Sequence, residues 1–100
     1  MTASALDTAR LERFERKMQG VLNGAAVALM TSIGHRTGLF DVMSRMRPAT
    51  SAVIAAAAGL DERYVREWLA AMVTGGVVDY EPRERCYALP RERCYALPRA

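Results

Sequence analysis

The order of hydrophobic and polar positions between Thr50 and Tyr80 predicts a helix, a tight turn, a second helix, a glycine stop and a strand. The first helix is alanine-rich and spans residues 51–58, with Thr50 as its N-cap, and residues 59–60 make the turn. Asp61 suits the N-cap of the second helix, because its carboxylate can accept from the unpaired backbone donors of the next turn. Four apolar residues then follow at i, i+3, i+4, i+7 spacing and are predicted to form the buried face of that helix: Val65, Trp68, Leu69 and Met72.

A glycine pair separates this second helix from the strand. Gly75 and Gly76 predict the end of the helix, since glycine adopts the left-handed conformation that a C-terminal cap needs. Val77 and Val78 then start a strand that runs to Tyr80. A helix–turn–helix followed by a strand predicts a mostly α winged helix with a small two-stranded wing. This shape can bind DNA, pair subunits or cover an active site, so it does not define a function by itself.

Helical periodicity also runs through the N-terminal third, which predicts extra helices ahead of the winged helix. We expect residues 1–10 to be frayed and favour two helices that meet at Gly20. Charges occupy the other faces of the first half, whereas residues 20–32 carry none. A domain of 100 residues has little interior in which to bury such a segment on every side. We therefore expect it to contact a second copy or a second domain; the alternative is that it packs beneath the helix–turn–helix. The periodic apolar positions are Leu11, Phe14, Met18, Val21, Leu22, Ala25, Leu29 and Ile33.

Three small residues follow one another at four-residue spacing in this region. They are Gly20, Gly24 and Ala28, and this spacing would let another helix approach closely. We predict that they mark a dimer or domain interface.

The octapeptide RERCYALP occurs at residues 83–90 and again, identically, at residues 91–98. The CYAL segment fits the returning strand of the wing, but only one copy can fill that place. Pairing the first copy closes a shorter loop, which loop-closure entropy favours by about 0.8 kcal/mol. We therefore place the winged-helix domain at residues 11–90 and expect the tail, residues 91–100, to be poorly ordered or to lie along the edge. The duplication is typical of a recent tandem event or a sequence artefact.

Composition narrows the function classes. The net charge is +3, of which residues 1–80 contribute +1 and the last twenty residues +2, so the basic balance is a weak indication of nucleic-acid binding. Two cysteines and one histidine cannot supply a four-ligand zinc site. The N-terminus has no apolar core of a signal peptide, and the longest apolar stretch, residues 21–33, is shorter than the ~20 residues of a membrane span. We expect a cytoplasmic protein with reduced thiols.

No catalytic, cofactor-binding or metal-binding constellation is predicted. A glycine-rich loop between a strand and a helix is missing, because the glycine pair follows a helix and precedes a strand. His35 has no partner in a nucleophile pattern and is interpreted as a helix-end residue. Cys86 and Cys94 lie in the duplicated strand and are interpreted as packing or exposed thiols.

DNA binding is the alternative hypothesis, and it depends on the second helix of the helix–turn–helix. That helix starts with Asp61 and Glu62, whose carboxylates would face the phosphates. Its two arginines form i, i+4 pairs with glutamates, and no Asn, Gln, Ser or Lys is available for base edges. Arginines in the wing could touch phosphate, although Glu81 and Glu84 flank them. Contacts under this hypothesis would come from Arg63, Arg66, Arg83 and Arg85.

Three segments resemble a bacterial protein family: SIGHRTGLFDVM at 32–43, AAAGLDERYVREWLAAMVTGGVVDY at 56–80 and YALP at 87–90. The family is the class I S-adenosylmethionine-dependent methyltransferases that carry an N-terminal winged-helix domain. The resemblance covers roughly residues 11–90 and implies a domain that helps to form a dimer and closes over the substrate side of a separate Rossmann-like catalytic domain. It also implies S-adenosylmethionine as the cofactor of that catalytic domain, whose glycine-rich loop and acidic ribose ligand are not in this sequence.

The function that we expect is therefore the winged-helix dimerisation and substrate-capping domain of a methyltransferase, truncated before the catalytic domain. The expected partners are a second copy of the chain, the catalytic domain, or both. The alternatives are a small winged-helix DNA-binding transcriptional regulator and a bare dimerisation module.

Overall fold

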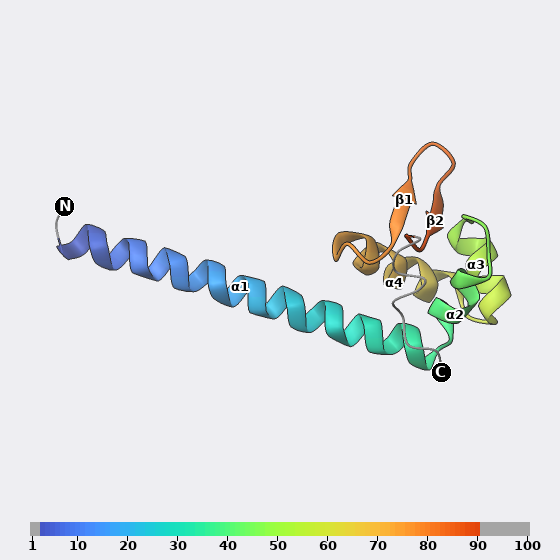
Figure 1. The fold of residues 1–100 in the computed structure, drawn as a ribbon, viewed down its shortest axis with the longest axis horizontal. Coiled ribbons are helices and arrows are strands. Elements are labelled where there is room, and N and C mark those ends of the chain that lie inside the picture. Colours follow the sequence, from blue (N-terminus) through green and yellow to red (C-terminus); the bar gives the residue numbers. More distant parts are fainter. Residues whose placement is uncertain (1–2, 91–100) are drawn as a thin grey trace.

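The computed structural model describes residues 3–90, which contain four α-helices and one two-stranded antiparallel sheet. Figure 1 shows a long rod-like helix with the other elements gathered at its C-terminal end. The molecule is accordingly elongated, with extents of 59 × 32 × 25 Å. This arrangement confirms the mostly α winged-helix fold. In chain order the elements are α1 (Ala3–Arg36), α2 (Leu39–Ser44), α3 (Ser51–Ala58), α4 (Glu62–Thr74), β1 (Asp79–Glu81) and β2 (Cys86–Ala88).

The helix α1 is one continuous helix of 34 residues, so the prediction of two helices that meet at Gly20 is wrong. A glycine in a helix interior costs only about 0.5–1 kcal/mol relative to alanine. Good helix formers on both sides of Gly20 outweigh that cost. The helix also begins at Ala3, so residues 3–10 lie in its first turns and not in a frayed end. At 1.5 Å per residue, α1 is a rod about 51 Å long.

Glycines and side-chain caps set the ends of the short helices. The chain leaves α1 through Gly38, whose φ of 77° places it in the left-handed region before α2. Thr50 caps α3, because its hydroxyl oxygen accepts a hydrogen bond from the backbone N–H of Val53 at 3.3 Å. Gly59, with a φ of 68°, ends α3 and turns the chain toward α4. These local signals produce the first helix and the turn of the helix–turn–helix.

The helix α4 lies at the centre of the core and contacts both α3 and α1. Its N-terminus is capped by Asp61, whose carboxylate accepts from the backbone N–H groups of Arg63 at 2.9 Å and Tyr64 at 3.4 Å. The face of α4 with i, i+3, i+4, i+7 spacing is fully buried and joins apolar side chains from every other described element except β1. The buried core consists of Leu39, Phe40, Met43, Ile54, Ala55, Val65, Trp68, Leu69, Met72, Val77, Val78 and Leu89.

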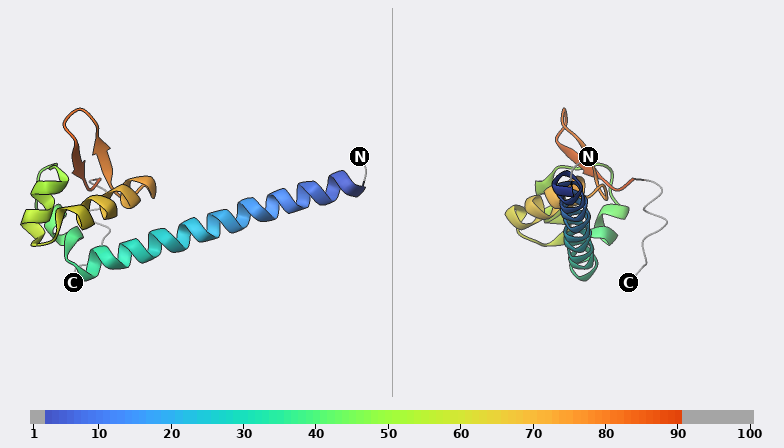
Figure 2. Two further views of the ribbon diagram at one scale, coloured as in Figure 1. Left: turned by 180° about the vertical axis from the view of Figure 1, so that it is seen from behind. Right: turned by 90° about the vertical axis from the view of Figure 1, so that its left-hand side faces the viewer.

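The wing begins two residues later than predicted. Val77 and Val78 are buried anchors beneath the wing, and β1 starts at Asp79. The strands pair with Asp79 opposite Ala88 and Tyr80 opposite Tyr87, so the first copy of the octapeptide supplies the returning strand, and the second copy lies outside the described residues. Tyr87 also exchanges two backbone hydrogen bonds with Ala49, which ties the wing to the segment before α3. Both views in Figure 2 show the hairpin projecting away from the helices.

Candidate functional site

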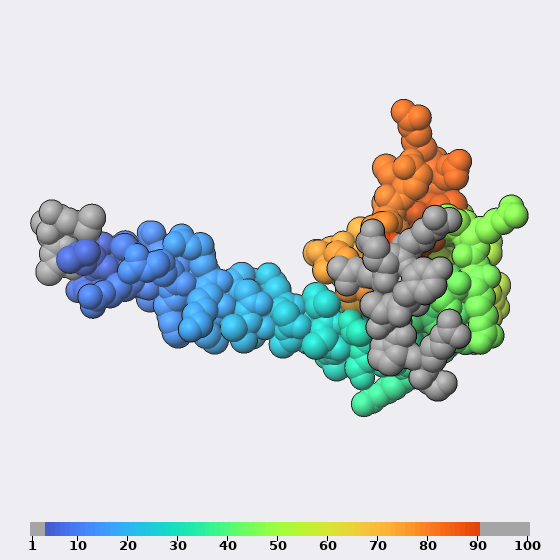
Figure 3. Space-filling model, in the orientation of Figure 1, coloured from blue at the N-terminus to red at the C-terminus, as the bar shows by residue number. Residues whose placement is uncertain are grey.

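The most unusual surface of the molecule is an exposed apolar face on α1. Seven large hydrophobic side chains of this helix are between 39% and 62% exposed, and six of them, all except Leu6, lie on one side of it. At 100° per residue, all six fall within about 100° of the helix circumference. We call them the outer stripe: Leu11, Phe14, Met18, Val21, Leu22 and Leu29. Figure 3 shows the N-terminal part of α1 extending without neighbours, so no described residue covers this part of the stripe.

The opposite face of α1 packs against the winged helix. Val27, Met30 and Ile33 are partly buried against the core. The indole N–H of Trp68 donates to the backbone carbonyl of Met30 at 2.9 Å, which fixes α4 against α1. Helical geometry places Val27 and Met30 roughly 130–170° from the middle of the outer stripe, whereas Ile33 lies only about 70° from it, beside the C-terminal end of the stripe. The helix α1 therefore has one face that belongs to its own domain and another that meets no described residue.

Two glycines bring α1 into close contact with that domain. A Cβ atom added at Gly34 would lie 2.5 Å from Phe40 Cε2 and 2.6 Å from Trp68 Cζ2. One added at Gly75 would lie 2.7 Å from Val27 Cγ2. The sequence analysis considered Gly75 only as part of a helix stop and did not single out Gly34. The available signal for Gly34 was a glycine inside the apolar C-terminal turns of a helix, followed closely by an aromatic residue.

The small residues predicted to mark an interface lie elsewhere. Among the described residues, nothing lies within 4 Å of a Cβ atom built at Gly20 or Gly24. Ala28 is exposed and lies at the edge of the sector occupied by the outer stripe. The close approach of a helix at these three residues is not made within the described chain and stays a prediction.

The start of α4 is acidic and internally paired. Glu62 accepts a hydrogen bond from the Ser51 hydroxyl at 2.6 Å and lies 3.8 Å from Arg66. Arg63 lies 3.6 Å from Glu67. Both ion pairs are exposed and contribute little stability, but they place a carboxylate beside each arginine of the helix.

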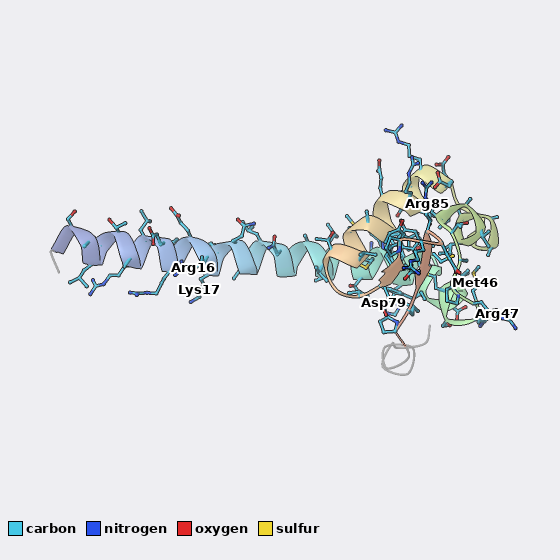
Figure 4. All side chains as sticks on the ribbon, turned by 90° about the horizontal axis from the view of Figure 1, so that it is seen from above. Arg16, Lys17, Met46, Arg47, Asp79 and Arg85 are labelled. Carbon is cyan, nitrogen blue, oxygen red and sulfur yellow. The ribbon has the colours of Figure 1, made fainter. Side chains whose placement is uncertain are left out.

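The basic side chains within residues 3–90 do not form one patch. Arg83 and Arg85 are exposed in the turn of the wing, and Arg83 lies beside Glu81, whose carboxylate accepts from its backbone N–H at 2.9 Å. Figure 4 shows Arg16 and Lys17 on the long helix, far from Arg85 and Arg47 at the winged-helix end. This separation is unfavourable for a continuous phosphate-binding surface.

The remaining titratable groups of residues 3–90 are not arranged as a catalytic site. Burial raises the pKa of the Tyr87 phenol, and the neighbouring Tyr80 raises it further. Their rings pack at a centroid distance of 4.7 Å in the wing. His35 lies in the last turn of α1 with its ring edge-on to Phe40. Within residues 3–90, no group of three His, Cys, Asp or Glu side chains is placed to hold a metal ion. No helix in the same range is both long and apolar enough to cross a bilayer.

Comparison with known proteins agrees with this geometry. Residues 25–99 match the family model described as the Rv2258c-like winged HTH domain. The chain belongs to this family. A solved structure of the mitomycin 7-O-methyltransferase MmcR has the same fold as this Rv2258c-like domain, with a TM-score of 0.65 and 23% sequence identity. The match covers 97% of this chain but only 27% of the methyltransferase chain. No curated protein has a significant sequence match.

Proposed function

We propose that this Rv2258c-like domain is the N-terminal winged-helix domain of an S-adenosylmethionine-dependent methyltransferase, in which it pairs subunits and covers the substrate side of the catalytic domain. Methyl transfer and cofactor binding belong, in this proposal, to a separate Rossmann-like domain. The support is the winged-helix family together with the fold shared with part of an O-methyltransferase.

The single observation that carries the pairing role is the outer stripe. Its side chains are more exposed than large hydrophobic residues of a folded domain usually are, and they form one contiguous face. Contiguous apolar patches of more than a few hundred Å² usually mark an interaction surface. A two-fold dimer is the commonest way in which soluble proteins use such a surface.

The pairing role is tested by light scattering on the purified chain. A dimer is expected at about 100 μM protein, because association depends on concentration. Val21→Asp, in the middle of the outer stripe, should convert it to a monomer while the fluorescence of Trp68 stays unchanged. Asn23→Asp is the matched control on the solvated side of the same helix and should remain dimeric. A stable monomer of the unmodified chain at that concentration would contradict the pairing role.

The division of labour with a catalytic domain is tested by calorimetry. We expect no binding of S-adenosylmethionine to the 100-residue chain, because no strand–glycine loop–helix unit is present among the described residues to hold the cofactor. Micromolar binding to this chain would show that the cofactor site lies within it and would contradict the assignment.

A further inference from the structure

We propose that the partner of the outer stripe is α1 of a second copy, running antiparallel, with the two-fold axis crossing the helix pair at the level of residues 19–20. This inference rests on the proposed pairing role and adds its orientation and register. In this register, two residues of different copies lie at the same level along the helix pair when their residue numbers add up to 39. The same sum describes the ends of α1, Ala3 and Arg36, so the two helices overlap along their whole length.

The first argument is a gradient of side-chain size along the helix. The inward positions of a heptad on this face are Leu11, Phe14, Met18 and Val21, followed by Ala25 and Ala28. Bulky side chains therefore occupy the N-terminal half of the seam and small ones the C-terminal half. A parallel pair would set Phe14 against its own copy at one end and alanine against alanine at the other. Its helix axes would then have to diverge, which close-packed interfaces disfavour.

The antiparallel register removes this mismatch. Leu11 meets Ala28 of the second copy, Phe14 meets Ala25, and Met18 meets Val21. Each layer then combines a larger side chain with a smaller one, so the separation between the helix axes stays nearly constant. The two-fold axis repeats each layer once, and the central layers combine Met18 and Val21, side chains of intermediate size.

The second argument is the distribution of charge. Residues 3–17 of α1 carry four basic and three acidic side chains, whereas residues 18–34 carry none. A parallel pair sets the two halves with net positive charge side by side, and the antiparallel pair sets each against an uncharged half. In this register Lys17 lies level with Leu22 of the second copy and Glu15 level with Gly24, so like charges do not meet.

One electrostatic contact favours the other orientation. A parallel pair could join Arg10 to Glu15 of the second copy at the edge of the seam. Both side chains are exposed, however, and exposed ion pairs contribute little to association. The packing of the seam involves fully desolvated side chains, so it decides the orientation.

The placement of the winged helix is compatible with the antiparallel pair. Figure 1 shows the other elements above the C-terminal end of α1, while the lower side of the helix is open. Val27 and Met30 on the packed face point about 130–170° away from the middle of the outer stripe. A second helix can therefore lie along the stripe, and the two winged helices come to opposite ends of the helix pair without meeting.

Spin-label distances on the full 100-residue chain distinguish the two orientations. Both native cysteines are first replaced by serine, and a nitroxide is attached at Thr8→Cys. The antiparallel register separates the two labelled positions by about 35 Å along the axis, whereas a parallel pair brings them to about the 10 Å spacing of packed helices. A label at Gln19→Cys is the matched control, because both orientations give it a similar, short distance.

Disulfide formation between single-cysteine variants provides a second readout. Phe14→Cys and Ala25→Cys chains of different mass should crosslink to each other when mixed, and neither should crosslink to itself. Self-crosslinking of each variant and a short Thr8 distance would overturn the antiparallel register while leaving the dimer intact. A monomer in light scattering would overturn both this register and the proposed pairing role.

Discussion

At the scale of single residues, the joint between the long helix and the winged helix depends on the absence of a side chain at Gly34. A Cβ atom there would overlap the rings of Phe40 and Trp68. We expect Gly34→Ala to destabilise the fold by about 1–3 kcal/mol, because overpacking outweighs the gain in helix propensity. Gly20→Ala in the same helix has open space around it and should instead stabilise by about 0.5–1 kcal/mol. Urea denaturation of both variants measures the two signs, and a stabilised Gly34→Ala would show that the joint is loose.

Trp68 is the other half of this joint and is only 2% exposed. Its ring packs edge-on to Phe40 at a centroid distance of 5.2 Å, and its N–H donates to α1. Trp68→Ala should therefore cost about 3–5 kcal/mol, a large part of the stability of a domain this small. Tyr64→Ala, an exposed ring on the same helix, is the control and should change the melting temperature little. Equal effects of the two substitutions would contradict the central place of Trp68 in the core.

The two residues of the joint differ in how far the sequence predicts them. The spacing of Val65, Trp68, Leu69 and Met72 indicates a buried helical face without knowledge of its partner, because periodicity is a local property. The role of Gly34 depends on the rings of Phe40 and Trp68 that reach it from other elements. The local pattern marks a glycine in apolar helical turns but does not identify Trp68 as its neighbour.

At the scale of elements, the short helices follow from their caps, whereas the extent of α1 does not follow from any single residue. The charges and apolar spacing predict helix on both sides of Gly20, but they do not say whether the helix continues through it. Whether the helix continues through Gly20 depends on the summed helix propensities of many residues, and here that sum outweighs the cost of one glycine. The wing shows the same limit, since burial of Val77 and Val78 beneath the core delays the strand to Asp79.

The contribution of the N-cap of α4 to stability can be measured directly by substitution of Asp61. Asp61 accepts two backbone hydrogen bonds at the start of the helix. Asp61→Ala leaves those donors unpaired and should cost about 0.5–2 kcal/mol, whereas Asp61→Asn keeps an acceptor and should cost much less. Thermal unfolding of both variants checks this order. If Asn were as damaging as Ala, the cap would act through its charge and not through its hydrogen bonds.

At the scale of the whole molecule, one helix, α1, both packs against the core of its own domain and presents an exposed apolar face. The C-terminal turns of α1 complete the core of the winged helix, and the outer stripe remains available for a partner. The sequence analysis indicated surplus apolar surface in this region but left open whether it packs beneath the helix–turn–helix. The structure shows packing beneath the helix–turn–helix for Val27, Met30 and Ile33, while Leu29 in the same turns stays exposed and its contact with a partner stays a prediction. The amphipathic pattern alone does not separate the buried from the exposed apolar residues of this region. Leu29 and Met30 are adjacent in sequence, yet Leu29 is exposed and Met30 packs against the core.

The charge distribution over residues 3–90 is unfavourable to the DNA-binding hypothesis, which needs a basic recognition surface. Here the start of α4 presents Asp61 and Glu62, and the arginines of the helix lie beside glutamates. We expect no sequence-specific binding in the range of about 10⁻⁸ to 10⁻¹¹ M that is typical of specific complexes at physiological salt. Selection from a random duplex pool by gel shift measures this directly.

A weak, non-specific interaction through the wing would have a different signature in the same assay. It should disappear as salt is raised, because phosphate contacts release counterions, and Arg85→Ala should weaken it for every sequence equally. Arg16→Ala, on α1 and far from the wing, is the matched control and should change it less. Recovery of a defined motif that binds at nanomolar protein and survives physiological salt would contradict the prediction. The regulator hypothesis would then replace the methyltransferase one, because the outer stripe could equally pair two DNA-binding subunits.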